Sequence, residues 1–338
     1  MLSFWELQNG YRRYQSTLQR HPRCSTECEN GVPVHDTFAR LISTIEPKVF
    51  RQCFLSWMQA VHRLTQGEIV AIDGKTLRGS YNREDRYSTI HMLSAYATAN
   101  QMVLGQLKIS DKSNEITAIP ELIQMLDLRG ALVTIDAMAC QTKIAKTIVG
   151  QGGDYLLAVK GNQERLAKAV RAAFASHCKA TVDKKQWQTE QHHGRVESRT
   201  CHVLSSEHLE GNFSRWSGLS SIVMVESFRA LKGKGSTLEC RYYISSKVLT
   251  AEEASYAIRA DWGIESMHWI LDVTFGEDAC QIYRENAAEN VASLRHMALN
   301  MLRAESTKIS MPMKQKRCLM NTTFLEGVLC AGFSSMAN

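Results

Sequence analysis

The sequence predicts an α/β fold in which a mixed sheet is flanked by helices. Three observations predict it: short apolar runs alternate with helical segments over residues 67–179, a β-rich stretch follows at 180–249, and helices return at 250–305. Such alternation is typical of α/β proteins. Of the 338 residues, 44% are hydrophobic and 22% are charged, which is ordinary globular usage and argues against disorder.

The chain before the sheet is expected to be irregular at first and then helical. Residues 1–34 show no regular hydrophobic period, and the stretch HPRCSTECENGVP is typical of loops. From His35 onward apolar residues recur at helical spacing, with Asp36 or Thr37 as the expected N-cap. Residues 1–66 are therefore predicted to be a lead-in followed by helices.

The first half of the sheet is expected between residues 68 and 128. The segment EIVAIDGKTL (68–77) is a short apolar run that predicts a buried strand, with Asp73 at or just past its end. Residues 88–98 and 101–110 predict an antiparallel hairpin joined by Ala99-Asn100. Residues 116–128 then predict a helix with a proline in its first turns.

Two more buried strands and the remaining helices complete the predicted core. The second strand covers 131–139 with Asp136 near its carboxyl end, and the third covers 154–160. Helices are expected over 143–152, 164–178, 250–275 and 285–305. Thr250 and Glu253 have the spacing of a capping box at the start of the third of these helices. Residues 306–338 form a basic tail.

Asp73 and Asp136 are the most informative side chains in this pattern. Each follows a buried strand, and ligands of open α/β sheets bind at the carboxyl ends of strands. Two neighbouring carboxylates repel each other unless a cation lies between them, and Mg²⁺ prefers such oxygen ligands. The pattern favours a magnesium site, although each aspartate could instead cap only the turn that follows it.

A third acid is expected on the helix over 250–275. One face of that helix carries Asp261, Trp262, Glu265, His268, Trp269 and Asp272. Glu265 is central on this face and is the preferred third ligand, with Asp272 and Asp278 as other candidates. The alternative is that the tryptophans belong to the core and that the acids pair with Arg259 and Arg295.

Charge and cysteine usage restrict the class of protein. Lys and Arg outnumber Asp and Glu by 40 to 34, so the net charge of +6 permits a polyanionic partner without demanding one. No apolar run reaches the roughly 18 residues needed to span a bilayer, and the N-terminus turns polar too early for a secretory signal. The 10 cysteines are therefore expected to be reduced, mostly buried thiols in the cytoplasm.

Several segments resemble one known family at length and in the same order. They are GVPVHDTFAR, VAIDGKTLRGS, DKSNEITAIPELIQMLDLRGALVTIDAMACQ, GGDYLLAVKGNQ, RYYISS and GIESMHWILDVTFGEDACQIYRENAAENVASLRHMALNML. Over about Gly31 to Arg303 the chain is similar to the H-repeat-associated family of bacterial insertion-sequence transposases, which belongs to the DDE transposases.

The resemblance implies a ribonuclease-H-like fold with Asp73, Asp136 and Glu265 as the three catalytic and metal-binding acids. These acids would hold two Mg²⁺ ions, for which Mn²⁺ substitutes, and would catalyse cleavage at element ends and strand transfer into target DNA. The implied partner is double-stranded DNA, bound by a homodimer. Two alternatives stay open, namely an inactive DNA-binding relic and a non-transposing nuclease of the same fold.

The sequence also departs from the family. The family usually has Arg-x-His-Trp before the glutamate, whereas this chain has Arg259-Ala-Asp261-Trp262. The related Tyr-(2)-Arg-(3)-Glu-(6)-Lys signature is not reproduced around Glu265. Residues 1–30 do not resemble the family's helical lead-in, which predicts a truncated or altered copy.

Weaker candidates for DNA contact surround the acids or lie in basic stretches. They are Lys75, Lys160, Asn162, Gln163, Arg195, Arg259, Trp262, His268, Trp269, Lys314, Lys316 and Arg317. Basic side chains that contact phosphates would make DNA affinity salt-dependent, and the tryptophans could stack on a flipped base.

Overall fold

The computed structural model describes residues 34–62, 67–81, 89–109, 115–177, 183–192, 195–231 and 235–333. The irregular lead-in and the altered N-terminus expected from the sequence lie outside the described residues. None of the described helices is long and apolar enough to cross a membrane.

One mixed sheet organises the described residues. Its nine strands follow the order β3-β2-β1-β4-β5-β9-β8-β7-β6. The strands are β1 (Ile69–Thr76), β2 (His91–Ala97), β3 (Met102–Ile109), β4 (Leu132–Ile135), β5 (Asp154–Val159), β6 (Asp183–His192), β7 (Arg195–Ser205), β8 (Ser221–Leu231) and β9 (Gly235–Ser245). The central strands β1, β4 and β5 are parallel and the remaining pairs are antiparallel. The predicted fold class, a ribonuclease-H-like mixed sheet with helices, is confirmed.

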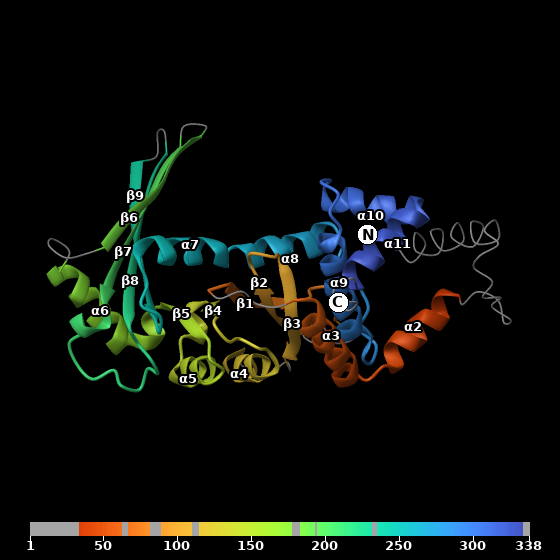
Figure 1. The fold of residues 1–338 in the computed structure, drawn as a ribbon, viewed down its shortest axis with the longest axis horizontal. Helices are drawn as coiled ribbons and strands as arrows, with labels where there is room; N and C mark the ends of the chain where they lie inside the picture. The colour runs from red at the N-terminus through yellow and green to blue at the C-terminus, as the bar shows by residue number, and fades with distance from the viewer. Residues whose placement is uncertain are drawn as a thin grey trace.

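Helices cover both faces of the sheet. They are α2 (His35–Thr44), α3 (Pro47–Val61), α4 (Glu115–Met125), α5 (Thr142–Gly150), α6 (Glu164–His177), α7 (Ala251–Asp261), α8 (Gly263–Val273), α9 (Ala287–Ala304), α10 (Met311–Met320) and α11 (Thr322–Phe333). Figure 1 shows α4 and α5 below the central strands, while α7 and α8 run end to end above them. The end-to-end pair places the acids of α7 and α8 over β1 and β4.

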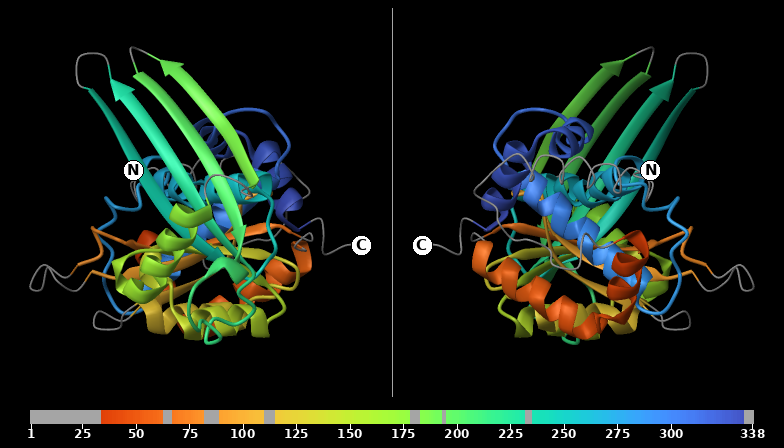
Figure 2. Two further views of the ribbon diagram at one scale, coloured as in Figure 1. Left: turned by 90° about the vertical axis from the view of Figure 1, so that its left-hand side faces the viewer. Right: turned by 90° about the vertical axis from the view of Figure 1, so that its right-hand side faces the viewer.

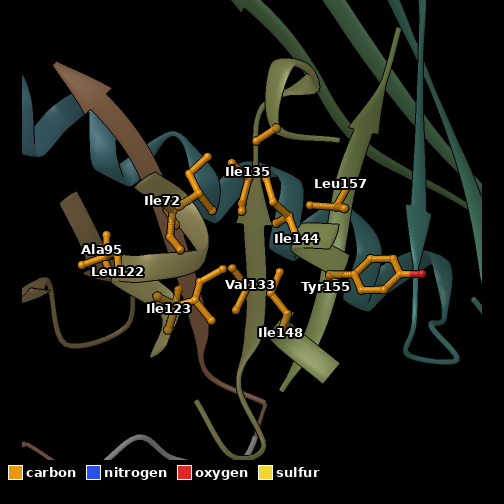
Figure 3. Close-up of a cluster of buried hydrophobic side chains, with 14 of the residues drawn as sticks. Ile72, Ala95, Leu122, Ile123, Val133, Ile135, Ile144, Ile148, Tyr155 and Leu157 are labelled. Atoms are coloured by element: carbon orange, nitrogen blue, oxygen red, sulfur yellow. The ribbon is translucent and has the colours of Figure 1, made fainter. Parts of the chain in front are cut away.

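The lower face of the sheet holds the main apolar core. Ile72, Val133 and Tyr155 come from the three parallel strands, and Leu122 and Ile144 reach them from α4 and α5 (Figure 3). Burying a side chain of this size contributes about 1.5–3 kcal/mol. Because successive residues of a strand point to opposite faces, Ile72 on the lower face leaves Asp73 on the upper face. The hydrophobic core therefore fixes which way the first predicted acid points.

The β-rich stretch after α6 extends this sheet. β9 pairs with β5 in antiparallel register, from Leu156 opposite Ser245 to Val159 opposite Tyr242. The long strands β6 to β9 rise past α7 and project well beyond the helices (Figure 2). Ala251, Ala254 and Ala257 of α7 pack on the buried side of these strands, so α7 is held by the core and by the β-rich stretch together.

Some predicted boundaries are wrong for local reasons. α2 begins at His35 with Val34 as its N-cap and without a side-chain cap, so Asp36 lies in the first turn rather than capping the helix. The helix expected over 250–275 is capped by Thr250 and Glu253 as predicted, but it breaks at Trp262 into α7 and α8. The short strand β4 ends at Ile135 because the turn after it is a 3₁₀ helix.

The basic stretch after residue 305 is helical where it is described. α10 and α11 contact each other and pack on α9. The indole Nε1 of Trp57 in α3 donates to the carbonyl of Gly332 in α11 at 2.9 Å, which fastens α11 to α3. Of the described cysteines only Cys140 and Cys201 are buried, so the expectation of mostly buried thiols is wrong.

Candidate active site

Asp73 lies on β1 where its pairing with β4 stops. The parallel register ends at Ile72 opposite Ile135, whereas β1 continues to Thr76 through its pairing with β2. Asp73 is therefore inside the strand, whereas the sequence had suggested a position at or just past the end of the strand. Its side chain is 40% exposed, and its Oδ2 lies 3.5 Å from Nδ1 of His268 on α8.

Asp136 follows β4 directly and caps the 3₁₀ turn Ala137–Ala139. Residues 136–141, which include this 3₁₀ turn, are called the 136–141 turn below. Its Oδ1 accepts backbone N–H bonds from Met138 at 3.0 Å and from Ala139 at 3.3 Å. Capping is thus a real role of Asp136. The residue is exposed, which leaves room for a ligand beside the cap.

Two acids reach this region from the helices above the sheet. Asp261, the last residue of α7, accepts a 2.6 Å hydrogen bond from Oγ1 of Thr134 on β4. Glu265 lies in the first turn of α8 and is exposed. The sequence favoured Glu265 as the third ligand, but Asp261 is the one whose side chain bonds to β4, the strand that Asp136 follows.

Glu115 is a further acid at this edge of the sheet that the sequence did not single out. It begins α4, and its carboxylate lies so close to Gly74 that a Cβ there would overlap its Oε1. Gly74 adjoins Asp73, so the small glycine lets a second carboxylate approach the first one. The signal was the pair Asp-Gly: a glycine after an acid at a strand end indicates close approach of another group.

Burial and like charges dominate the electrostatics. Burial raises the pKa of Asp73 to about 6, against a lowering by the Gly74 backbone hydrogen bond, and the carboxylates of Glu115, Asp136 and Asp261 raise it further. Burial and then Asp136 raise the pKa of Glu115. The pKa of Asp261 is raised chiefly by burial, and the Thr134 hydrogen bond opposes this. Four acids therefore share one electrostatic environment.

The donor chemistry of these acids fits a hard divalent cation. Among the described residues, the basic side chain beside Asp73 is His268, and burial lowers the pKa of that imidazole to about 3, so it carries no compensating charge. Carboxylate oxygens without a neighbouring cation are what Mg²⁺ binds. Within the same described residues, however, no three Asp, Glu, His or Cys side chains converge closely enough to hold one ion.

Lys75 is not placed for the phosphate contact expected from the sequence. Its ammonium bonds to Asp272 and, at 2.8 Å, to Glu277, and it lies 3.9 Å from Asp278. Its side chain is largely buried. Lys75 therefore fastens the end of α8 and the following loop onto β1, because a buried carboxylate such as Glu277 needs a cation beside it.

The tryptophans of α7 and α8 are surface residues. Trp262 is 40% exposed and Trp269 is 61% exposed, so the alternative that both belong to the core is wrong. The guanidinium of Arg199 on β7 lies 4.9 Å from the centre of the Trp262 ring. His268, by contrast, is mostly buried between α8 and β1, which leaves it little access to DNA.

The amide groups of Asn162, which is exposed, and of Gln163, which is half-buried, both bond to the protein backbone. Nδ2 of Asn162 donates to the carbonyl of Ala137 at 2.6 Å. Nε2 of Gln163 donates to the carbonyl of Cys140 at 2.9 Å. Both bonds end on the 136–141 turn, so these side chains hold the turn. Lys160 beside them is exposed.

The basic residues of the C-terminal helices differ in accessibility. Lys314 is buried, and its ammonium donates to the carbonyls of Leu302 and Glu305, which end α9. Lys314 therefore has no access to a phosphate in this structure, contrary to expectation. Lys316 and Arg317 are exposed, as is Arg259 on α7. The side chain of Arg195 lies outside the described residues.

The sheet order, the acids within β1 and directly after β4, and the helix pair α7–α8 define a protein of the ribonuclease-H-like class with a β-rich stretch before its last acidic helices. A family model described as "Transposase DDE domain" matches residues 64–301, and one described as "DDE_Tnp_1-associated" matches residues 8–58. The chain belongs to the DDE transposase family. The second match covers most of the lead-in, so the expectation that residues 1–30 do not resemble the family is wrong.

Individual relatives agree with this assignment. "Putative transposase YncI" of Escherichia coli O157:H7 is 46% identical over 311 residues, which cover 90% of this chain and 79% of that protein. "H repeat-associated putative transposase YhhI" of Escherichia coli K12 is 44% identical over 310 residues, covering 89% of this chain and 82% of that protein. A solved piggyBac transposase synaptic complex with hairpin DNA aligns with this chain at a TM-score of 0.45 and 12% identity, and the alignment covers 90% of this chain and 64% of that one.

Proposed function

We propose that this chain is a divalent-metal-dependent transposase that cuts DNA at the ends of an insertion sequence and joins those ends to target DNA. The observation that carries the proposal is the set of carboxylates around Asp73: burial of Asp73, and then the charges of Glu115, Asp136 and Asp261, raise its pKa to about 6. Family membership supports the same reaction. We further propose that a homodimer acts on double-stranded DNA in the bacterial cytoplasm.

Asp73, Asp136 and Glu265 are the residues proposed to hold two Mg²⁺ ions, with Mn²⁺ as a substitute. When bound, such ions activate an oxygen nucleophile and stabilise the departing oxygen of the scissile phosphate. Asp136 contributes from a fixed turn, because two backbone N–H groups hold its Oδ1. Glu265 contributes from the exposed side of α8.

The surface around these acids supports a DNA partner. Trp262, with Arg199 on its ring, presents an aromatic and cationic face at the start of α8, and Trp269 is exposed about two turns further along the same helix. Aromatic faces stack on unpaired bases and arginine contacts phosphates. We propose that Lys160, Arg259, Lys316 and Arg317, which are exposed, contact the DNA backbone.

The direct test is a Mg²⁺-dependent cleavage assay on DNA that carries the element ends. Asp73→Asn, Asp136→Asn and Glu265→Gln should each reduce cutting by at least about 100-fold, since each removes charge that stabilises the transition state. Asp127→Asn is the matched control, because Asp127 is an exposed partner of Arg129 far from this edge of the sheet. Cutting at the wild-type rate by Asp73→Asn or Asp136→Asn would refute the proposal.

One observation favours a second candidate, a DNA-binding relic without catalytic activity. Asp261 occupies the position of the usual family histidine and adds a half-buried carboxylate near Asp136. A relic should bind element ends without cleaving them in Mg²⁺ or Mn²⁺. Asp261→His should then restore cutting. An active wild-type chain whose rate is unchanged by Asp261→His excludes the relic.

A further inference from the structure

The 136–141 turn is held from both ends by side chains of another loop. Asn162 and Gln163 lie in the 3₁₀ turn Gly161–Gln163 after β5, and β5 is the parallel neighbour of β4. The amide of Asn162 reaches the carbonyl of Ala137 at 2.6 Å, and that of Gln163 reaches the carbonyl of Cys140 at 2.9 Å. Gln163 also donates to Oε1 of Gln141 at 3.2 Å.

One peptide group links Asn162 to Asp136. The carbonyl of Ala137 and the N–H of Met138 belong to the same peptide, and that N–H donates to Oδ1 of Asp136 at 3.0 Å. The hydrogen bonds therefore form one chain, from the Asn162 amide through the Ala137–Met138 peptide to the Asp136 carboxylate. Each bond of such a chain polarises the next, so the bond that Asn162 donates strengthens the one that Asp136 accepts.

We propose that Asn162 and Gln163 are positioning residues that fix the carboxylate of Asp136 for metal binding. The proposal rests on the proposed function, in which Asp136 is a metal ligand. Asn162 and Gln163 hold the carbonyls of the turn, and the N–H groups of the turn hold Oδ1 of Asp136, so the carboxylate keeps one orientation. Their role is thus in the shape of the site, whereas the sequence had suggested contacts to DNA.

The geometry separates these two residues from their neighbour Lys160. Lys160 precedes them in the chain and is exposed, and none of the described hydrogen bonds joins its side chain to the 136–141 turn. A residue that only contacts DNA affects DNA binding alone. A residue that holds the turn affects metal binding even when no DNA is present, because partners of ligands typically contribute 10–100-fold to metal affinity.

The experiment is Mn²⁺ titration calorimetry on the full chain without DNA. Asn162→Ala and Gln163→Ala should each weaken Mn²⁺ binding about 10-fold. Asn162→Asp keeps the size of the side chain but replaces its donor with an acceptor, so it should weaken binding at least as much. Lys160→Met, the matched control, should bind Mn²⁺ like the wild type and lose affinity only for DNA.

Asp136→Asn separates failure of this proposal from failure of the proposed function. If Asp136→Asn binds Mn²⁺ as the wild type does, Asp136 is not a ligand and the proposed function fails. If Asp136→Asn weakens binding while the three variants of Asn162 and Gln163 do not, only the positioning role is refuted. In the double variant Asn162→Ala/Asp136→Asn, the positioning role predicts no loss beyond that of Asp136→Asn.

Hydrogen exchange of the peptide covering 136–141 is the second measurement. If one of the variants Asn162→Ala, Asn162→Asp and Gln163→Ala folds poorly, the other two still test the proposal. Loss of the hydrogen bonds from Asn162 and Gln163 to the 136–141 turn should speed exchange of the Met138 and Ala139 amides at least several-fold, while exchange in α9 stays unchanged. Exchange at the wild-type rate in well-folded variants would overturn the proposal.

Discussion

Replacing Asp73 by asparagine should stabilise the metal-free protein. The pKa of Asp73 is raised from 3.8 to about 6, so the folded state holds the proton that the unfolded state releases. Stability then falls as pH rises from about 4 to about 6, and the full penalty is present above the folded pKa. Asparagine cannot ionise and therefore escapes this penalty.

The size of the effect follows from the shift and the exposure. The rise in the pKa of Asp73 from 3.8 to about 6 corresponds to about 3 kcal/mol. The side chain of Asp73 is 40% exposed, and solvent screening reduces the interaction to about 1 kcal/mol. Asp73→Asn should therefore raise the free energy of unfolding by about 1 kcal/mol at pH 7.5, and the gain should shrink as the pH approaches 4.

Excess Mg²⁺ should make the wild type more stable than Asp73→Asn, which reverses their order of stability in the absence of metal. A ligand at 100 times its dissociation constant stabilises a folded protein by about 2.7 kcal/mol, and this gain requires the carboxylate that Asp73→Asn removes. Urea unfolding with EDTA and with excess Mg²⁺ checks both halves of the prediction, with Asp127→Asn as the control that should respond to Mg²⁺ like the wild type. A less stable Asp73→Asn protein in EDTA, or an equal gain from Mg²⁺ in both proteins, would refute the reasoning.

Three more predictions follow from the contacts around this edge of the sheet and from the C-terminal helices. Lys75→Met leaves Glu277, whose side chain is 2% exposed, without its cation and should cost about 3–5 kcal/mol in urea unfolding; Lys75→Met/Glu277→Gln should recover part of the loss. Lys314→Met removes the buried donor to the Leu302 and Glu305 carbonyls and should cost about 1.5–3 kcal/mol without changing the salt dependence of DNA binding, whereas Lys316→Met should leave stability intact and lower the slope of log K against log salt by about 1. Gly74→Ala forces the Glu115 carboxylate aside and should weaken Mn²⁺ binding as Glu115→Gln does, while Gly150→Ala, with open space at its Cβ position, should not. Equal Mn²⁺ affinity in the wild type and all three variants would contradict a role for Glu115 in metal binding.

The order of strands and helices could be predicted from local patterns. The strands of the core are short apolar runs bounded by polar residues, and Thr250 and Glu253 form the capping box that their spacing indicates. The predicted ends of strands were wrong where pairing with a neighbouring strand sets the end. β1 extends past Asp73 because β2 pairs with it up to His91 opposite Thr76, and no periodicity within β1 contains that information.

The candidate site could be predicted only in outline. Asp73 lies within β1 and Asp136 directly follows the neighbouring parallel strand β4, and the structure brings them into one electrostatic environment. Their catalytic role, with that of Glu265, stays a prediction. Glu115 was missed because it begins a helix and has no motif of its own, and its nearness to Asp73 depends on how α4 docks against β1.

By itself the sequence determined the α/β class, the family and the two acids of the central strand segments, because these depend on local hydrophobic periodicity and on short motifs. The tertiary structure alone decided the partners of the polar side chains. Lys75 meets Asp272 across 197 residues of chain, and Asn162 meets Ala137 across 25. Such pairs form only when packed helices and strands bring distant segments to within hydrogen-bonding range, and no local pattern encodes that distance.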